Sequence, residues 1–511
     1  MPFVSLGFLG FVATAVVVYY LVPLRFRWVV LLFASYVFYM VGGWQTVFYI
    51  VFTTGVTYCA ALFLGRVNVL LEGLPRDSTE STRLKRQKKL IAAAALILCF
   101  GILFVLRYWN FAMGMVFSHD RFMLNLLIPL GVSFYIFQSV GYVIDVYRAK
   151  HPPEKNPAKY ALFVSFFPQI IQGPIGRFHH LAPQLTAGAV LDFTNIKYGL
   201  QLAIWGYFKI LVIGDRTGIF VDEIFINIGI HNGTVTAIAV FMYCIQLYCA
   251  FSGGIDITRG VAKMLGIEMA ENFRRPLFAV SLADFWRRWH ITLGAWLKDY
   301  LFFSLALSRP IVRIGKFTRS RVGGTLGKII PTSICTFTVY FAIGLWHGAS
   351  FRFVAFGIWN GVIITSSLLL AGFYSGIKKR LRINDNARLW WVFSIMRTSF
   401  IVFIGRYMTR APRFMYAVRM LWRTFMDFRF ETLFDGTLLG FGITGFDMII
   451  VAIAVLVMIL VELYQERGGF VRKALEERGA FVQVAAIIIP LAVIVFFGMW
   501  GLVEQFIYGQ L

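Results

Sequence analysis

The sequence is poor in charged residues, in acidic residues above all, and in cysteine. Charged residues make up 14% of the 511 positions and hydrophobic residues 59%, whereas an average soluble domain is about 25% charged. The five cysteines include no pair at CxxC spacing, so neither a disulfide framework nor a cysteine zinc site is indicated. Together with a mean hydropathy of +0.73, these deficits predict an all-α polytopic membrane protein.

Acidic residues number 25 against 49 lysines and arginines, which gives a formal charge of +24. The basic residues fall in short loops between apolar runs and not in one stripe. This distribution is typical of the positive-inside rule and of attraction to anionic lipid heads. We therefore expect membrane lipids as partners and no nucleic acid.

Several motifs are missing as well. No GxSxG nucleophile elbow is present, which disfavours a serine hydrolase, and no GxxxxGK[ST] loop is present, which disfavours an NTP-driven pump. No internal repeat stands out. These absences leave the polar residues inside the apolar runs as the source of functional signals.

The apolar runs predict about 11 to 14 transmembrane or re-entrant helices, and the first run is interpreted as an uncleaved span. The expected spans cover residues 3–23, 28–41, 44–65, 90–108, 123–146, 193–213, 233–251, two within 328–371, 390–405, 446–463 and 482–503. Between them, the basic loops 76–89, 148–159 and 378–388 are expected on the cytoplasmic side. Residues 251–301 look irregular and charged, and residues 406–430 resemble an amphipathic helix at the membrane interface.

Residues 161–183 are too interrupted for an ordinary span. Pro168, Gly173 and Pro174 break the apolar run, which favours a broken or re-entrant helix packed inside protein. Such a segment would direct its polar side chains at a cavity, namely Gln169, Gln172, His179 and His180. An interfacial loop at the lipid headgroups is the alternative.

His347 lies in an apolar stretch, in the sequence GLWHGA, where an ionisable group is costly to bury. Gly344 and Gly348 flank the Leu-Trp-His triplet and would let backbone or a substrate come close. The imidazole is a candidate for chemistry within the membrane. A histidine satisfied by a neighbouring carbonyl is the structural alternative.

A second polar cluster follows Ser281. Helical spacing would bring Asp284 against Arg287 and Arg288, with Trp286 and His290 on another face. The same pattern suits an interfacial helix anchored by Trp and Arg. Adjacent His179 and His180 lack a carboxylate or thiol at usable spacing, so no metal site is expected.

The two histidine motifs, DFWRRWHITLGAWLKDYLFF at 284–303 and GLWHGASFRFVAFGIWNGV at 344–362, resemble the membrane-bound O-acyltransferase (MBOAT) family. The likeness is greatest to its bacterial branch, which contains the membrane proteins of alginate O-acetylation and teichoic-acid D-alanylation. The motif FPQIIQGPIGRF at 167–178 agrees as well. The resemblance covers about residues 1–430, the expected acyltransferase core. Residues 431–511 would add C-terminal transmembrane helices to the same membrane domain.

The resemblance implies a ring of tilted helices around a thin core with a central tunnel. It also implies that His347 and His290 are the catalytic histidines, His347 as the base, since a neutral imidazole with a pKa near 6.5, roughly, can take a hydroxyl proton. The implied substrate-binding residues are Trp346, Trp286, Gln169, Gln172, Asp284 and Arg288, of which Asp284 and Arg288 would also hold their helix in place.

The resemblance further implies transfer of an acyl group, acetyl above all, from a cytoplasmic thioester to a hydroxyl outside the cytoplasmic membrane. The donor would be acetyl-CoA or an acyl carrier protein, and no bound cofactor is expected. The acceptor would be a cell-surface polysaccharide or an extracytoplasmic partner, such as an SGNH-type acyltransferase or a polysaccharide-modification complex. The alternatives are D-alanyl transfer to teichoic acid, a transporter or flippase with histidine proton relays, and a catalytically silent scaffold.

Overall fold

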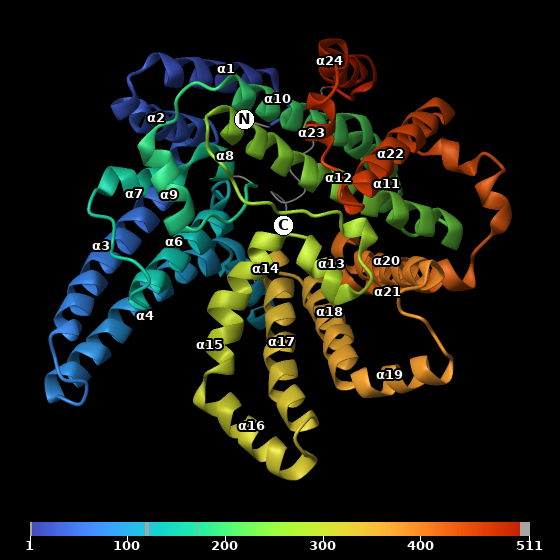
Figure 1. Cartoon of the computed structure of the whole chain (residues 1–511). Coiled ribbons are helices and arrows are strands. Elements are labelled where there is room, and N and C mark those ends of the chain that lie inside the picture. Colours follow the sequence, from blue (N-terminus) through green and yellow to red (C-terminus); the bar gives the residue numbers. More distant parts are fainter. Residues whose placement is uncertain (1–2, 118–121, 171, 501–511) are drawn as a thin grey trace. The chain divides into compact units, whose positions relative to one another are not determined.

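The computed structural model describes residues 3–117, 122–170 and 172–500, and within them the chain is helical (Figure 1). The only β feature in these ranges is a single bridge between Phe273 and Trp289. Nine helices of the described part are long and apolar enough to cross a membrane, and the shorter Leu6–Leu21 is apolar too. The expectation of an all-α polytopic membrane protein is confirmed.

The chain forms two compact units. The first contains residues 1–206 and 254–270, with a C-terminal piece outside the described residues; the second contains residues 207–253 and 271–504. The helices of the first unit are α1 (Leu6–Leu21), α2 (Arg27–Met40), α3 (Val47–Glu72), α4 (Thr79–Arg107), α5 (Trp109–Val116), α6 (Val132–Tyr147), α7 (Pro157–Ser165), α8 (Phe167–Ile170), α9 (Phe178–Ala187) and most of α10 (Phe193–Tyr207).

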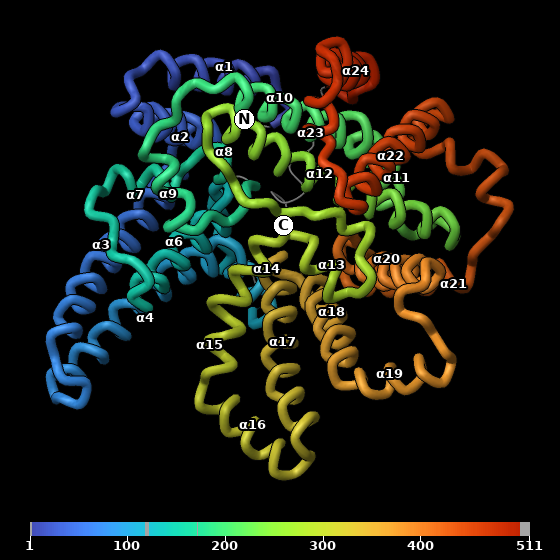
Figure 2. The backbone as a smooth tube through the Cα atoms, viewed as in Figure 1, coloured from blue at the N-terminus to red at the C-terminus, as the bar shows by residue number. Residues whose placement is uncertain are grey.

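The core of the first unit forms around α6, whose side chains are almost all buried. Helices α3, α4 and α7 pack against it, and α3 and α4 run side by side as a long pair (Figure 2). On the α7 side, Tyr142 contacts the rings of Tyr160 and Phe178, each at 4.6 Å between centroids. Aromatic packing of this kind adds to the burial energy of a core.

The second unit begins with a π-helical turn at Phe208–Gly214. Its helices are α11 (Asp215–Ile226), α13 (Leu282–Arg288), α14 (Ile291–Leu297), α15 (Phe303–Ala306), α16 (Arg309–Val322), α17 (Leu326–His347), α18 (Phe351–Leu369), α19 (Ala371–Arg380), α20 (Arg388–Arg410), α21 (Phe414–Met426), α22 (Gly445–Glu466), α23 (Val471–Glu476) and α24 (Ala480–Phe497). Helix α12 (Gly233–Met264) contributes residues to both units.

Three expected boundaries are wrong. The basic segment 76–89 is mostly helix, because Ser78 caps α4 through its side chain and the lysines and arginines that follow are good helix formers. The expected span 123–146 begins only at Val132, after Gly131 in a left-handed conformation. The segment expected to turn irregular at 251 continues α12 to Met264, since its buried residues keep helical spacing.

Other expectations are confirmed. Residues 161–183 contain three short helices in place of one span, and α21 is an amphipathic helix within 406–430. Residues 328–371 form the α17–α18 hairpin with His347 at its turn. The final expected span, 482–503, appears as α24, and its last residues lie outside the described part.

Candidate active site

The α17–α18 hairpin places His347 at the end of a helix. Helix α17 stops at His347 because Gly348 caps it, donating its N–H to Leu345 at 3.2 Å, and Ser350 then precedes α18. Below the turn the two helices touch through glycines. A Cβ on Gly344 would lie 2.4 Å from the Phe353 carbonyl oxygen and 2.8 Å from the Gly357 Cα. The hairpin therefore depends on small residues at its crossing, as is common between membrane helices.

The His347 side chain is buried, with 7% of the residue exposed. Its ring lies 5.0 Å from that of Trp346, 5.6 Å from Phe356 and 6.1 Å from Phe353, centroid to centroid. The hairpin itself supplies all three rings. His347 is thus packed among the aromatic side chains of its own hairpin.

His290 lies between α13 and α14 in the left-handed region, with φ of 48°. The fully buried Asn272 holds it there. The Asn272 side-chain oxygen faces His290 Nδ1 at 3.3 Å and accepts the Thr292 backbone N–H at 3.0 Å, while its backbone oxygen accepts the Ile291 N–H at 3.0 Å. The expectation of one helix with Trp286 and His290 on the same face is therefore wrong, because the helix breaks at His290.

These bonds determine the tautomer of His290. Because the Asn272 oxygen already accepts a backbone N–H, it is an acceptor, so His290 Nδ1 carries the hydrogen and Nε2 carries the lone pair. Burial lowers the pKa of His290 to about 3. The imidazole is neutral at physiological pH.

Trp346 lies between the two histidines. Its ring is 5.6 Å from His290 and 5.0 Å from His347. The His290 ring also packs edge-to-face on the ring of Phe251, at 5.0 Å between centroids. The structure thus brings both predicted histidines and Trp346 into one buried cluster, although 57 positions separate the histidines.

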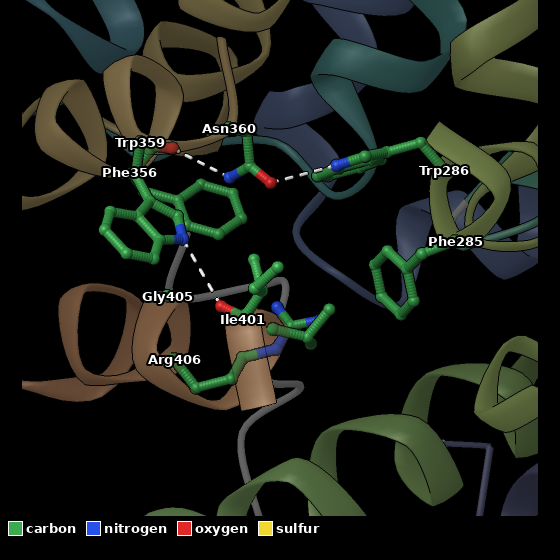
Figure 3. A pocket seen from close by; sticks show the side chains of 9 residues that line it. Phe285, Trp286, Phe356, Trp359, Asn360, Ile401, Gly405 and Arg406 are labelled. Atoms are coloured by element: carbon green, nitrogen blue, oxygen red, sulfur yellow. Dashed lines mark hydrogen bonds between the residues drawn. The ribbon is translucent and has the colours of Figure 1, made fainter. Parts of the chain in front are cut away.

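Trp286 is half-buried on α13 and faces α18. Its indole N–H donates to the Asn360 side-chain oxygen at 3.0 Å, and the Asn360 amide in turn donates to the Phe356 carbonyl at 2.8 Å. These residues border a hollow on one side of the cluster (Figure 3). The hollow is small and has room for roughly one water molecule. Its lining consists of Phe285, Trp286, Phe356, Trp359, Asn360, Ile401, Val402, Gly405 and Arg406.

Asp284 and Arg288 are occupied with protein partners. Asp284 accepts from Arg287 at 3.2 Å and from Arg288 at 3.0 Å, as the helical spacing predicts. Arg288 also donates to Glu466 at 3.0 Å, and Glu466 pairs with Arg275 at 2.7 Å. This network ties the end of α22 to the segment that carries His290.

Gln169 and Gln172 belong to the first unit and are buried, each 3% exposed. The Gln169 amide donates to the Gln138 side chain at 2.8 Å, and a Cβ on Gly254 would lie 2.7 Å from the Gln172 oxygen. His179 and His180 are exposed on α9, so the expectation that they point inward is wrong. Among the described residues, no three His, Cys, Asp or Glu side chains gather where they could hold a metal ion.

Sequence reasoning missed three residues of this site: Asn272, Asn360 and Glu466. Asn272 occurs in ENFRRP, 18 residues before His290, and no periodicity connects the two. Glu466 ends the C-terminal helix α22, far along the chain from its two arginines. Only the three-dimensional contacts reveal these roles.

This polytopic helical protein, with two histidines buried on either side of a tryptophan, belongs to the membrane-bound O-acyltransferase family. A family model described as MBOAT, membrane-bound O-acyltransferase family, matches residues 154–318, a range that includes Gln169, Gln172 and His290. The chain is an O-acyltransferase and a multi-pass membrane protein. This membership favours acyl transfer over the transporter and scaffold alternatives.

Named relatives come from three groups. The chain is 30% identical over 464 residues to the probable alginate O-acetylase AlgI of Pseudomonas syringae pv. tomato, covering 88% of this chain and 80% of the relative. It is 32% identical over 271 residues to the peptidoglycan O-acetyltransferase of Helicobacter pylori, covering 47% and 48%. It is 23% identical over 330 residues to the teichoic acid D-alanyltransferase of Bacillus subtilis, covering 64% and 79%.

Proposed function

We propose that the protein is an O-acetyltransferase of the cytoplasmic membrane. It takes acetyl from acetyl-CoA, or from an acyl carrier protein, at the cytoplasmic face and delivers it to a hydroxyl of a cell-surface polysaccharide or of an extracytoplasmic partner. Acetyl is favoured over D-alanyl because the acetylases named above are at least 30% identical to this chain and the D-alanyltransferase 23%. The observation that carries the proposal is the buried cluster of His347, Trp346 and His290.

In the proposed reaction His347 acts as a general base. The acceptor oxygen attacks the thioester carbonyl while its proton passes to the His347 imidazole. The C–S bond then breaks, and the thiolate takes that proton from the imidazolium, so His347 ends the cycle neutral. His290 orients donor or acceptor, Trp346 and Trp286 shape the passage, and Gln169 and Gln172 bind substrate. Asp284 and Arg288 support the His290 segment.

The test uses purified protein in lipid vesicles, radiolabelled acetyl-CoA and a hydroxyl-bearing oligosaccharide. His347→Ala should reduce acetyl transfer at least 100-fold, roughly the lower end of what general-base catalysis contributes, with unchanged yield and membrane insertion. His179→Ala is the matched control, because that histidine is exposed, and should keep full activity. Normal transfer by His347→Ala would refute the catalytic assignment, and D-alanyl transfer from a carrier thioester in place of acetyl would correct the acyl group.

A further inference from the structure

The hollow beside the histidine cluster contains a buried cation. Arg406 lies on α20, within a membrane-spanning helix, and is 6% exposed. Its side chain extends from α20 among the residues that line the hollow (Figure 3). A charged side chain inside a membrane helix is costly and usually marks a functional pathway.

Within the described ranges, the Arg406 guanidinium has no carboxylate or hydrogen-bond partner. It lies instead over two aromatic rings, 4.9 Å from the centroid of Trp289 and 6.0 Å from that of Phe285. Cation–π contact holds the plane of the group but does not neutralise its charge. The five donors of a guanidinium suit a phosphate or carboxylate, which they bind in a bidentate manner.

Other arginines of the same region are paired. Arg410, one turn further along α20, forms an ion pair with Asp222, and Arg288 pairs with Asp284 and Glu466. Arg406 therefore differs from its neighbours in facing a hollow while lacking an anion. The hollow also borders the reaction centre, since Phe356 lines it and contacts the ring of His347 at 5.6 Å.

The position of the hollow along the α17–α18 hairpin indicates which substrate carries the anionic group that would bind Arg406. At about 1.5 Å per residue, Asn360 lies about 14 Å along α18 from its start at Phe351, midway along this 19-residue helix and thus nearer to the open end of the hairpin than His347 is. That end is flanked by Lys328, Lys379 and Arg380, which the positive-inside rule assigns to the cytoplasm. The hollow thus lies on the donor side of His347.

We infer that Arg406 binds the phosphate of the donor's phosphopantetheine group. This group is common to coenzyme A and to acyl carrier proteins, so the inference rests on the proposed thioester donor but not on the choice between the two. The hollow has room for roughly one water molecule, so binding of the phosphate would require its lining side chains to move apart. Arg406 would then fix the thioester relative to His347.

The experiment measures equilibrium binding of coenzyme A, 4′-phosphopantetheine and pantetheine to purified protein, so it requires no acyl transfer. Arg406→Gln should weaken binding of both phosphorylated ligands about tenfold to 100-fold, the range for a hydrogen bond between charged groups, and leave pantetheine unchanged. Arg406→Lys keeps the charge but loses the planar guanidinium, so its affinity for the phosphorylated ligands should lie between those of the wild type and Arg406→Gln. Arg388→Gln, an exposed arginine of the same helix, is the control and should bind like the wild type.

Each other outcome overturns the inference. Equal loss of pantetheine binding would show that Arg406 only supports the fold, and unchanged binding of all three ligands would show that it contacts no phosphate. Weaker binding of a uronate oligosaccharide, with coenzyme A unaffected, would assign Arg406 to an anionic acceptor. If the wild type does not bind 4′-phosphopantetheine, both the proposed thioester donor and this inference are wrong. If the wild type binds it and Arg406→Gln binds it equally well, this inference is wrong and the proposed donor is unaffected.

Discussion

His290 is held in a conformation that few residues adopt, and its partner Asn272 accounts for it. A non-glycine residue at φ of 48° is uncommon and is maintained only when its surroundings impose it. The Asn272 oxygens accept from three groups just after the break, namely the Ile291 and Thr292 backbone N–H groups and the Thr292 hydroxyl. Asn272 therefore holds the His290 imidazole in one orientation, with the hydrogen on Nδ1.

The neutral state of His290 predicts a pH dependence of stability. Its pKa is about 3 in the folded protein and about 6.5 in an unfolded chain. Below pH 6.5 the unfolded state therefore binds more protons, and stability falls as the pH drops toward 3, by roughly 2 kcal/mol at pH 5. The contribution is complete above pH 6.5. Thermal unfolding in detergent should show a steeper decline between pH 7 and 5 for the wild type than for His290→Gln.

The comparison of slopes isolates His290, because His179 and His231 titrate alike in both proteins. Partial loss of hydration lowers the pKa of both, so each adds the same pH dependence to the wild type and to the variant. Equal slopes would mean that His290 gains no proton on unfolding in this range. A steeper slope for the variant would contradict the assigned neutral state.

At the scale of helices, the crossing of α17 and α18 positions His347. Gly344→Ala would place a methyl group 2.4 Å from the Phe353 oxygen, so the helices must separate, at a cost of about 1–3 kcal/mol. We expect a lower thermal midpoint and lower transfer activity. Gly101→Ala is the matched control, a helix-interior glycine of α4 whose Cβ would meet nothing within 4 Å. A normal midpoint for Gly344→Ala would show that the crossing is not tightly packed.

The sequence predicts helices well where apolar runs are bounded by breakers. The GLWHGA turn is predicted correctly to separate α17 from α18, because a polar histidine between two glycines interrupts the apolar run and glycine is common just after the end of a helix. Prediction was wrong at 76–89, where charge suggested a loop and the capped helix α4 runs through, since helix propensity does not depend on hydropathy. It was also wrong at His290, because a break held by Asn272 depends on a contact with no local signal.

At the scale of the whole molecule, the basic segments predict orientation in the membrane. The segments 76–89 and 378–388 should lie on the same, cytoplasmic side. In a Cys59→Ser background, which removes the exposed cysteine, Thr82→Cys and Asn384→Cys should react with a membrane-impermeant thiol reagent from the cytoplasmic side only. Both positions are exposed. Labelling from opposite sides would contradict the orientation and, with it, the cytoplasmic donor.

The placement of Trp346 has a further consequence for how variants of this protein are interpreted. A single indole contacts both imidazoles, so a change at either ring alters the surface against which the other rests. Residues in contact through a shared neighbour show non-additive free energies. Losses measured separately for His290 and His347 will therefore not sum to the loss in the double variant, and a thermodynamic cycle that includes Trp346 is the appropriate unit for assigning energies to this pair.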